Sequence, residues 1–362
     1  MRPIPLVDVK AQYAPLLPEL KERLAEVLDA GVFILGPNVK AFEEEAAAFL
    51  GVSQTIGVAN GTDALVLVLD ALGIGAGDEV ICPAFTFYAT AESIARRGAT
   101  PVFAEIDPVT LNLDADDVAQ RVTERTKAIM PVHLFGRPMA LGPLARLGVP
   151  IVEDAAQAFG AAGVGTTGIA STFSFFPTKN LFALGDGGLV AVTDEELGER
   201  IRLLRFHGSR AKVDFELIGY NSRLDELQAA ALRLFLEHLP EWNRKRREAA
   251  ARYEELGLGE LLELPRDEPG HVYHMYCTRS GERDRIVETL AERRIGHAAY
   301  YVTPLHLQPA LRYLGYRDGD FPESERAARE NLCLPLWAGI DEATQLTVVE
   351  AVREAVSAGV AS

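Results

Sequence analysis

Apolar residues near the start of the chain recur with the spacing of amphipathic helices. Six of them fall on one face of a predicted helix over residues 15–30, namely Leu16, Leu17, Leu20, Leu24, Val27 and Leu28. The stretch GPNVKAFEEEAAAFLGV, residues 36–52, is predicted to be helical as well. The first helix is expected to have a structural role and to pack on something larger.

From residue 55 to residue 192 the pattern changes to short apolar runs that alternate with helical stretches. The runs are TIGVA, EVICP, TPVFAEI, TKAIMPVHL, VPIVED, STFSFF and GGLVAV. Several are apolar at consecutive positions, which is typical of strands covered on both faces. Helical stretches such as TDALVLVLDALG and ATAESIARRG separate them. The pattern predicts an α/β domain with a largely parallel central sheet.

A long helical region over residues 221–256 leads out of this sheet, and the chain then continues with HVYHMYCTR, RDRIVETLAERR and a final helix after Asp341. These last elements predict a small α+β domain. We expect a large α/β domain over residues 14–240 and a small α+β domain over residues 241–362. The N-terminal segment 1–13 is expected to pack on the small domain.

Composition and charge narrow the classes of function. The 362 residues carry a formal net charge of -16, with a pI near 5.0, which argues against a nucleic-acid-binding protein. No signal peptide and no membrane-spanning stretch is recognisable, so a cytoplasmic protein is expected. Cys82, Cys277 and Cys333 are widely spaced and are interpreted as reduced core residues.

The carboxyl ends of strands are where open α/β sheets bind ligands, and three predicted strand ends carry polar residues. After TIGVA the chain passes through Asn60, Gly61 and Thr62 into a helix. Free amides at a helix N-terminus, a close backbone approach at Gly61 and the Thr62 hydroxyl can together hold an anion. An ordinary turn and helix cap is the alternative.

The strand VPIVED ends with Glu153 and Asp154, and Gln157 follows three residues after Asp154. A carboxylate at this point could cap a helix, bind a metal or pair with a positively charged ring nitrogen. No HExxH motif or comparable His/Asp cluster accompanies it, so no metal is expected.

The third strand end, FSFFPTKNLFALGDGG, places Ser174 and Lys179 before a glycine-rich turn with almost no other charge nearby. A lysine in apolar surroundings loses its proton easily and becomes a nucleophile. A lysine, a carboxylate and an anion cradle together are what pyridoxal 5'-phosphate requires. They supply the Schiff base to its aldehyde, a partner for its pyridine nitrogen and a phosphate site.

At this point the sequence resembles the DegT/DnrJ/EryC1/StrS sugar aminotransferases, which have the aspartate-aminotransferase fold, fold type I. The resemblance covers nearly the whole chain, through motifs that include FILGPNVKAFEEE, GVANGTDAL, PAFTFYATAESI, IVEDAAQAFGA, FSFFPTKNL, GYNSRLDELQAA and YYVTPLHLQPALRYLGY. Many motifs in the same order make this match more specific than any one of them.

The resemblance implies a role for each cofactor residue. Lys179 binds the cofactor covalently, Asp154 pairs with its pyridine nitrogen and Gln157 lies near its phenolic oxygen. Phe87 stacks on the ring, with core packing as the alternative. Gly61, Thr62 and Ser174 bind the phosphate together with Asn221 of a second subunit, so that a homodimer shares each site.

The resemblance also implies the reaction. L-glutamate donates the amino group, pyridoxamine phosphate is the intermediate form of the cofactor, and a keto-sugar linked to a nucleotide accepts the group, giving an amino sugar. The tripeptide NSR at residues 221–223 resembles enzymes for 3-keto sugars more than enzymes for 4-keto sugars. Arg223, Tyr301 and His306 are candidate substrate contacts, and a structural histidine is the equal alternative for His306.

Three other functions remain open for a chain of this kind. Similar sequences include cyclitol aminotransferases, which act on keto-inositols. Sugar dehydratases of this type tend to have histidine at the position of Lys179 or a cysteine cluster, so this chain disfavours them. The fold could also serve a non-catalytic sensor, although a DNA-binding domain is not recognisable here.

Overall fold

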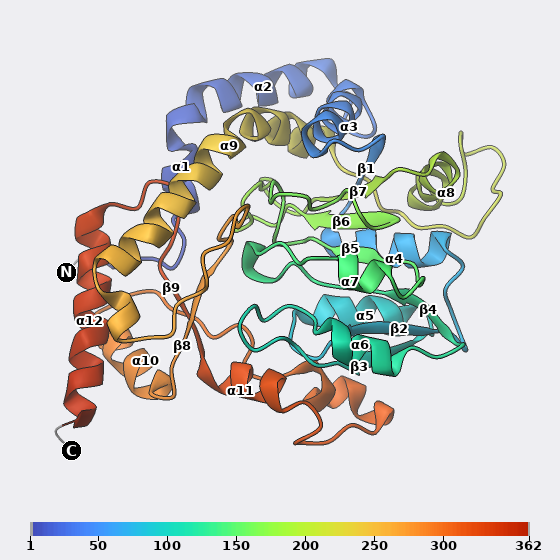
Figure 1. Ribbon diagram of the computed structural model, residues 1–362. Helices are drawn as coiled ribbons and strands as arrows, with labels where there is room; N and C mark the ends of the chain where they lie inside the picture. Colours follow the sequence, from blue (N-terminus) through green and yellow to red (C-terminus); the bar gives the residue numbers. More distant parts are fainter. Residues whose placement is uncertain (1–2, 361–362) are drawn as a thin grey trace.

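Seven short strands between residues 54 and 192 form the centre of the structure, a computed structural model that describes residues 3–360 (Figure 1). They are β1 (Gln54–Val58), β2 (Glu79–Pro83), β3 (Thr100–Ala104), β4 (Thr126–Ile129), β5 (Val152–Asp154), β6 (Ala170–Ser174) and β7 (Gly188–Val192). The strand orders are β1-β7-β6-β5 and β3-β2-β4. Parallel bridges from Ile129 to Ile151 and from Val132 to Asp154 join the two groups.

The direction of these strands agrees with the sequence pattern. β2 is parallel to β3 and β4, and β5 is parallel to β6. Only β7, among the seven, runs antiparallel to its neighbours β1 and β6. The prediction of a mainly parallel sheet is therefore confirmed, and each predicted run overlaps one of these strands.

Helices cover both faces of the sheet, as the continuous apolar runs require. Leu189 and Ala191 of β7 belong to the same buried cluster as α2 (Leu17–Ala30), α3 (Pro37–Leu50) and α9 (Glu226–Glu255). Val190 and Val192 point to the other face, into a cluster with α4 (Gly61–Ala71), α5 (Tyr88–Arg96) and α8 (Glu195–Arg205). The shorter α6 (Ala115–Arg121) and α7 (Gly142–Ala145) pack with a third cluster near β4.

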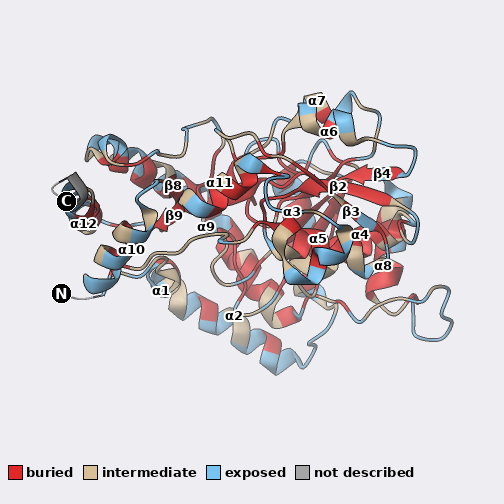
Figure 2. Cartoon of the chain, turned by 90° about the horizontal axis from the view of Figure 1, so that it is seen from below, coloured by how far each residue is buried: buried red, intermediate tan, exposed pale blue. Residues whose placement is uncertain are grey.

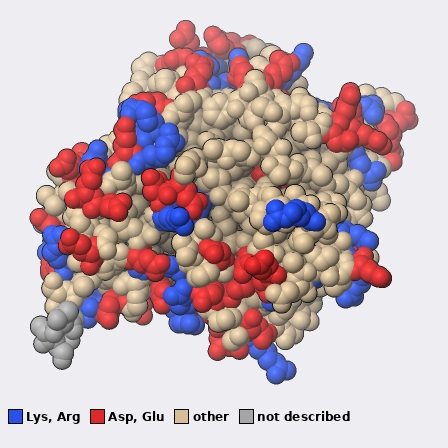
Figure 3. Space-filling view, in the orientation of Figure 1, with Lys and Arg blue, Asp and Glu red and all other residues tan. Residues whose placement is uncertain are grey.

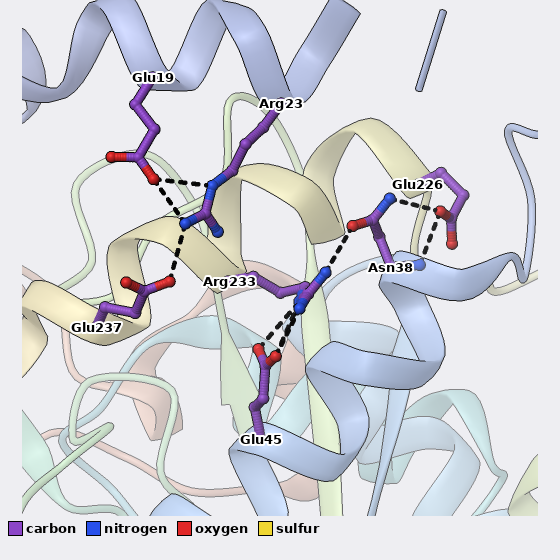
Figure 4. Close-up of polar contacts among 7 residues, drawn as sticks. All are labelled: Glu19, Arg23, Asn38, Glu45, Glu226, Arg233 and Glu237. Atoms are coloured by element: carbon purple, nitrogen blue, oxygen red, sulfur yellow. Dashed lines mark hydrogen bonds and ion pairs between the residues drawn. The ribbon is translucent and has the colours of Figure 1, made fainter. Parts of the chain in front are cut away.

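Polar contacts fix α3 against the long helix α9 (Figure 4). The buried Glu226 carboxylate accepts hydrogen bonds from the backbone amides of Asn38 and Val39, at 2.9 and 2.8 Å, and so caps the N-terminus of α3. Arg233 pairs with Glu45 at 2.8 Å. A carboxylate of α9 therefore supplies the cap that Gly36, the residue before α3, cannot.

Beyond α9 the chain forms a second, smaller sheet. β8 (Tyr276–Arg279) and β9 (Asn331–Leu334) are antiparallel, and they share a buried cluster with α10 (Arg283–Glu292) and α12 (Glu342–Val360). α11 (Pro322–Glu330) leads into β9, and α1 (Val9–Tyr13) begins the chain's helices. Single turns of 3-10 helix occur at Ala14–Leu16, Leu134–Gly136, Leu258–Glu260 and Leu305–Leu307, with a longer one at Pro309–Leu314.

The N-terminal segment lies against this C-terminal part. The amide of Ile4 donates to the carbonyl of Arg294 at 3.0 Å, and the amide of Leu336 donates to the carbonyl of Leu6 at 3.1 Å. The helix α9 runs without interruption across residue 240, so the division between residues 240 and 241 stays a prediction.

Burial follows the layers (Figure 2). Cys82, Cys277 and Cys333 are all buried and free, and Cys277 pairs with Cys333 in the register of β8 and β9. On the face shown in Figure 3, basic and acidic side chains are interspersed around a broad uncharged area. Within residues 3–360, no helix combines the length and hydropathy needed to cross a membrane.

Candidate active site

A cavity of about 430 Å³ opens where several parallel strands end. Its walls come from segments that follow β1, β2 and β4 and from the last residues of β5 and β6. Most of the residues predicted as cofactor or substrate contacts line it: Gly61, Thr62, Phe87, Asp154, Gln157, Ser174, Lys179 and Tyr301. Residues more than 200 positions apart in the sequence therefore meet in one site.

One wall of the cavity is the N-terminus of α4. The Asn60 side chain accepts a hydrogen bond from the amide of Asp63 at 2.8 Å and caps the helix. Gly61 begins the helix, and a Cβ atom there would lie 2.7 Å from Cβ of Ser174. A Cβ at Gly188 would overlap the backbone of Asn60. Two glycines thus let the helix end approach β6 and β7, which leaves its free amides for an anion.

Neighbouring carboxylates at the end of β5 point in opposite directions because side chains alternate along a strand. Glu153 turns away from the cavity and accepts hydrogen bonds from the amides of Gly165 and Gly168 and from His133 Nε2, at 3.0, 2.7 and 2.9 Å. Asp154 lines the cavity. Glu153 therefore has a structural role, whereas Asp154 is available to a ligand.

Asp154 is held in place by local contacts. The Thr90 hydroxyl donates to its Oδ2 at 2.8 Å and the amide of Ala156 donates to its Oδ1 at 3.2 Å. Burial raises the pKa of Asp154, while these two hydrogen bonds and the charge of Lys179 act in the opposite direction. No helix follows β5 directly, so the alternative of a helix cap does not apply. A cationic ring nitrogen is a partner that would keep this buried carboxylate ionised.

Lys179 lies in the turn that follows β6. Its backbone amide donates a hydrogen bond to the carbonyl of Phe176 at 2.8 Å. Its amine makes no hydrogen bond with any group in residues 3–360. Lys179 is half-buried in the cavity wall, and partial loss of hydration lowers its pKa to about 8, although the charge of Asp154 acts to raise it. About half of the Lys179 amines are therefore neutral and nucleophilic at pH 8, against about a tenth at pH 7.

Aromatic and amide side chains form another wall of the cavity. The Gln157 carbonyl accepts from the amide of Phe135 at 2.6 Å, and its Nε2 donates to the Tyr301 hydroxyl at 3.1 Å. Phe87 is 53% exposed, and its ring centre lies 5.9 Å from that of Tyr301. Because Phe87 borders the cavity and is not buried, its position does not fit the alternative of core packing.

Two predicted residues lie next to this cavity and not in it. Asn221 and Arg223 line a neighbouring, more polar pocket of about 360 Å³, which also contains Asn60 and Asp186. Arg223 donates to the Asn221 side chain and lies over the ring of Phe206, 5.5 Å from its centre. Asn60 and Asp186 line both pockets, so the two are direct neighbours.

His306 does not reach either pocket. It is 1% exposed, its Nε2 lies 3.0 Å from Oε1 of Glu325, and its ring packs 4.8 Å from that of Phe321. Burial lowers the pKa of His306, with Glu325 acting to raise it. This geometry fits the structural alternative that the sequence had left open, and we do not propose a substrate contact for it.

The site also includes residues that the sequence did not single out. Thr90 contacts Asp154, and the cavity is lined in addition by His274 and Asp186. Thr90 lies in the motif PAFTFYATAESI and Asp186 in GDGG, so both were within recognised segments. His274 comes from the chain before β8, 95 positions after Lys179 (274 minus 179), and carries no local signal.

The residues present fit pyridoxal 5'-phosphate on three independent observations. The α4 cradle, closed to any Cβ atom at Gly61, matches a phosphate group. The buried Asp154 matches a pyridinium nitrogen, and the Lys179 amine, whose pKa is lowered, matches an aldehyde. Fold and site together define the protein as a pyridoxal-phosphate enzyme with the aspartate-aminotransferase architecture.

Comparisons with known proteins agree with this class. Residues 16–353 match the DegT/DnrJ/EryC1/StrS aminotransferase family, so the chain belongs to that family. A pleiotropic regulatory protein of Geobacillus stearothermophilus is 47% identical over 97% of this chain and 98% of its own length. The dTDP-3-amino-3,4,6-trideoxy-alpha-D-glucose transaminase of Streptomyces venezuelae is 42% identical, over 97% and 96% of the two chains.

Solved structures show the same architecture. The crystal structure of S. venezuelae DesV, in complex with a ketimine intermediate, matches with a TM-score of 0.95 at 42% identity and covers 98% of both chains. NtdA of Bacillus subtilis, solved with bound pyridoxamine phosphate, matches with a TM-score of 0.92 at 29% identity, over 99% of this chain and 86% of its own. The predicted family, fold class, transaminase class and cofactor are therefore confirmed.

Proposed function

We propose that this protein transfers the amino group of L-glutamate to a 3-keto sugar linked to a nucleotide. The observation that carries the proposal is the meeting of Lys179, Asp154 and the N-terminus of α4 in one cavity. The class of reaction, transamination of sugars, comes from the family. The donor and the 3-keto position are the finer steps that the proposal adds.

The bound cofactor supplies an electron-withdrawing ring on which amino groups exchange. Around that ring the chain's own residues have separate tasks. Asp154 would receive the ring nitrogen, Gln157 would donate toward the phenolic oxygen, and Phe87 would cover one ring face. The amides of α4, Thr62 and Ser174 bind the phosphate.

Lys179 performs the proton transfer. With the cofactor bound and the Lys179 amine free, Nζ would take up a proton from the amino donor and hand it on within the same site; near pH 8 about half of these amines are neutral and able to accept it. Because burial lowers the pKa of this group, it can act as a base and as an acid at neutral pH.

The preference for a 3-keto sugar rests on two observations. Asn221 and Arg223 of the NSR tripeptide line the pocket beside the cavity, where a sugar could extend. The name of the S. venezuelae relative places its amino group on carbon 3 of a dTDP-linked sugar.

A shared site in a homodimer is the third part of the proposal. Among the residues of 3–360 that line the cavity, Lys179 is the one Lys or Arg, yet glutamate and nucleotide sugars bring carboxylates or phosphates. The two pockets are bordered by exposed apolar side chains, namely Ile34, Phe87 and Phe176. A second copy that covers this rim would bring its Asn221 and Arg223 to the anions.

The test is a stepwise assay of the purified protein loaded with pyridoxal 5'-phosphate. Addition of L-glutamate alone should abolish the visible cofactor band and release 2-oxoglutarate, which establishes the donor. Addition of dTDP- or UDP-linked 3-keto sugars should then give an amino sugar detectable by mass spectrometry, at rates at least tenfold above matched 4-keto sugars. Turnover of a keto-inositol, loss of water from the sugar, or binding without turnover would each contradict the proposal.

Binding without turnover is included among these outcomes for a specific reason. The relative from G. stearothermophilus is called a pleiotropic regulatory protein, although it is 47% identical to this chain. Lys179 and its lowered pKa are features of a catalyst, and a sensor would need neither. Release of 2-oxoglutarate by the wild-type chain would therefore decide between the two functions.

A further inference from the structure

Cys277 and Cys333 lie opposite each other in the two-stranded sheet of the C-terminal part. They are paired in the register of β8 and β9, and both thiols are free. The amide of Cys333 donates to the carbonyl of Ala298 at 2.7 Å, and the amide of Ala298 donates to the carbonyl of Cys333 at 3.3 Å. Both backbone groups of Cys333 thus point away from β8. The two cysteines therefore form a non-hydrogen-bonded pair of the antiparallel ladder.

A pair of this kind brings two side chains close together. Its Cα atoms lie about 4.5 Å apart, within the range of about 4.4–6.8 Å that a disulfide spans. The side chains also point to the same face of the sheet. Both cysteines belong to one buried cluster with Phe85, whereas the neighbouring pair Tyr276 and Leu334 belongs to another. The register and the shared face therefore allow a bond between the two sulfur atoms.

The two thiols differ in access. Cys277 lines a small cavity of about 20 Å³ together with Arg137 and Arg279. That volume holds about one molecule of the size of water. Cys333 is 0% exposed and does not line the cavity, whereas Cys277 is 5% exposed. A small, neutral oxidant therefore reaches Cys277 first.

We propose that Cys277 and Cys333 are a site of reversible oxidation, at which hydrogen peroxide converts the two thiols into one disulfide. Cys277 Sγ attacks a peroxide oxygen, the O–O bond breaks, and the leaving hydroxide departs as water with the proton of the thiol. Cys333 Sγ then attacks the sulfenic acid on Cys277. The S–O bond breaks, and a second water leaves with the proton of Cys333. The two sulfur atoms together lose two electrons, which reduce the peroxide.

The order of these steps agrees with the surroundings of the thiols. Burial, and after it the neighbouring Cys277, raise the pKa of Cys333 well above that of an ordinary thiol. Cys333 is therefore suited to the second step, in which an already oxidised sulfur is in contact with it. Within residues 3–360, no group of three or more His, Cys, Asp or Glu side chains could hold a metal, so the pair is not part of a metal site.

The cysteine pair lies behind one wall of the cofactor cavity. Asn331, two residues before Cys333 on β9, donates from Nδ2 to the carbonyl of Tyr301 at 3.3 Å. Tyr301 packs against the buried cluster of the cysteines, and its hydroxyl accepts a hydrogen bond from Gln157 in the cavity. A disulfide would draw the two sulfur atoms together and shift this wall. We therefore expect weaker binding of pyridoxal 5'-phosphate in the oxidised protein.

The experiment oxidises the native, full-length, cofactor-free protein with hydrogen peroxide. Catalase then removes the peroxide, N-ethylmaleimide blocks the free thiols in urea, and peptides are analysed by mass spectrometry without reductant. The wild type should give one intramolecular link between Cys277 and Cys333. The proposal is wrong if both remain thiols at a dose that converts the half-buried Met139 to its sulfoxide.

Titration of the visible cofactor band tests the effect on the cavity. The oxidised wild type should bind pyridoxal 5'-phosphate about threefold or more weakly, and dithiothreitol should restore the affinity. A linked protein with unchanged affinity would contradict the connection to the cavity wall. Neither measurement needs glutamate or a keto sugar, so failure of the proposed function would appear separately, as absent 2-oxoglutarate from the wild type.

Single variants separate the two chemical steps. In Cys333→Ala, oxidation should stop at a sulfenic acid on Cys277, which dimedone traps. In Cys277→Ala, Cys333 should remain a thiol at the same dose, and the cofactor affinity should not respond to peroxide. Sulfenic acid on Cys333 and none on Cys277 would overturn the proposed order.

Cys82 provides a matched control. It is also fully buried, but it lies opposite Phe103 in the register of β2 and β3. It should stay a free thiol in the oxidised wild type, and Cys82→Ala should form the same link with the same change in affinity. Loss of the affinity change in Cys82→Ala would assign the effect to oxidation at Cys82 and contradict the proposal.

Discussion

Thr90 Oγ1 donates a hydrogen bond of 2.8 Å to Oδ2 of Asp154, and both residues are buried. The bond links α5 to the end of β5, across 64 positions of sequence. It has a direct electrostatic effect, because it lowers the pKa of a carboxylate whose burial raises it. Thr90 therefore helps to keep Asp154 ionised and aimed at the cavity.

The first prediction is that Thr90→Val weakens catalysis by raising the pKa of Asp154. A hydrogen bond to a charged group is worth about 1.5–3 kcal/mol, so the pKa should rise by about one to two units. Because the carboxylate must be ionised, the acid limb of the kcat/KM profile should move to higher pH by a similar amount. Profiles between pH 5 and 9 test this.

Thr90→Ser is the matched control for that experiment because it keeps the hydroxyl and removes only a methyl group. Its acid limb should stay within about half a unit of the wild type. If the valine and serine variants share one profile, the hydroxyl of Thr90 does not control Asp154.

The second prediction concerns Lys179 and stability. Lys179→Met should abolish amino transfer, by about a thousandfold or more, because it removes the proton-transfer group. It should also stabilise the cofactor-free protein at pH 7, by about 1–3 kcal/mol, because a partly desolvated ammonium no longer has to be accommodated. Urea unfolding of the cofactor-free proteins measures the difference.

The sign of the pH dependence follows from the pKa shift of Lys179. Folding lowers this pKa from its ordinary value near 10.5 to about 8, so the unfolded chain binds the proton more tightly between these values. The wild type should therefore gain stability as the pH rises from 8 to about 10.5, and the advantage of the methionine variant should shrink. An advantage that is constant with pH would contradict the lowered pKa.

The third prediction tests the phosphate cradle. Gly61→Ala places a Cβ atom 2.7 Å from Cβ of Ser174, so α4 has to move away from β6. We expect at least tenfold weaker binding of pyridoxal 5'-phosphate, with about 1–3 kcal/mol lower stability from the overpacked contact. Titration of the visible cofactor band measures the affinity.

Gly142→Ala provides the control for this steric argument. A Cβ atom at Gly142 has no neighbour within 4 Å, and the residue begins the short helix α7. Its cofactor affinity and stability should equal those of the wild type within error. Wild-type affinity in Gly61→Ala would show that the helix end does not hold the phosphate.

These residues also show how far the sequence could lead. Lys179, Asp154 and Gly61 could be predicted because each follows a recognisable apolar run, and parallel strands bring their carboxyl ends to one edge. Thr90 and His274 could not, because their positions in the site depend on packing between segments that are distant in sequence. A pattern of apolar residues indicates which face of a helix or strand a side chain lies on. It does not indicate which distant residue that side chain contacts.

His306 is a second residue whose role could not be predicted from the sequence. Its place in the motif YYVTPLHLQPALRYLGY made a substrate contact as reasonable as a structural role. Glu325, 19 residues later, lies in α11 and meets the ring at 3.0 Å. Without the fold nothing connects these two residues, and the buried pair is visible only once α11 packs beside the 3-10 turn at Leu305–Leu307.

The last prediction tests the shared site with mixed dimers. Lys179→Met lacks the catalytic amine, and Asn221→Asp should place a carboxylate beside the partner's phosphate and abolish cofactor binding. Each variant alone should be inactive. In a mixed dimer, the site that takes Lys179 from one chain and Asn221 from the other is intact, while the second site carries both changes.

If the two chains exchange at random, half of the dimers are mixed and each has one intact site. The mixture should therefore recover about a quarter of the wild-type activity at equal total protein. Co-expression with two different affinity tags isolates the mixed dimer, which should show about half of the wild-type activity. Activity in Asn221→Asp alone, or none in the purified mixed dimer, would mean that Asn221 does not complete the site of the other chain.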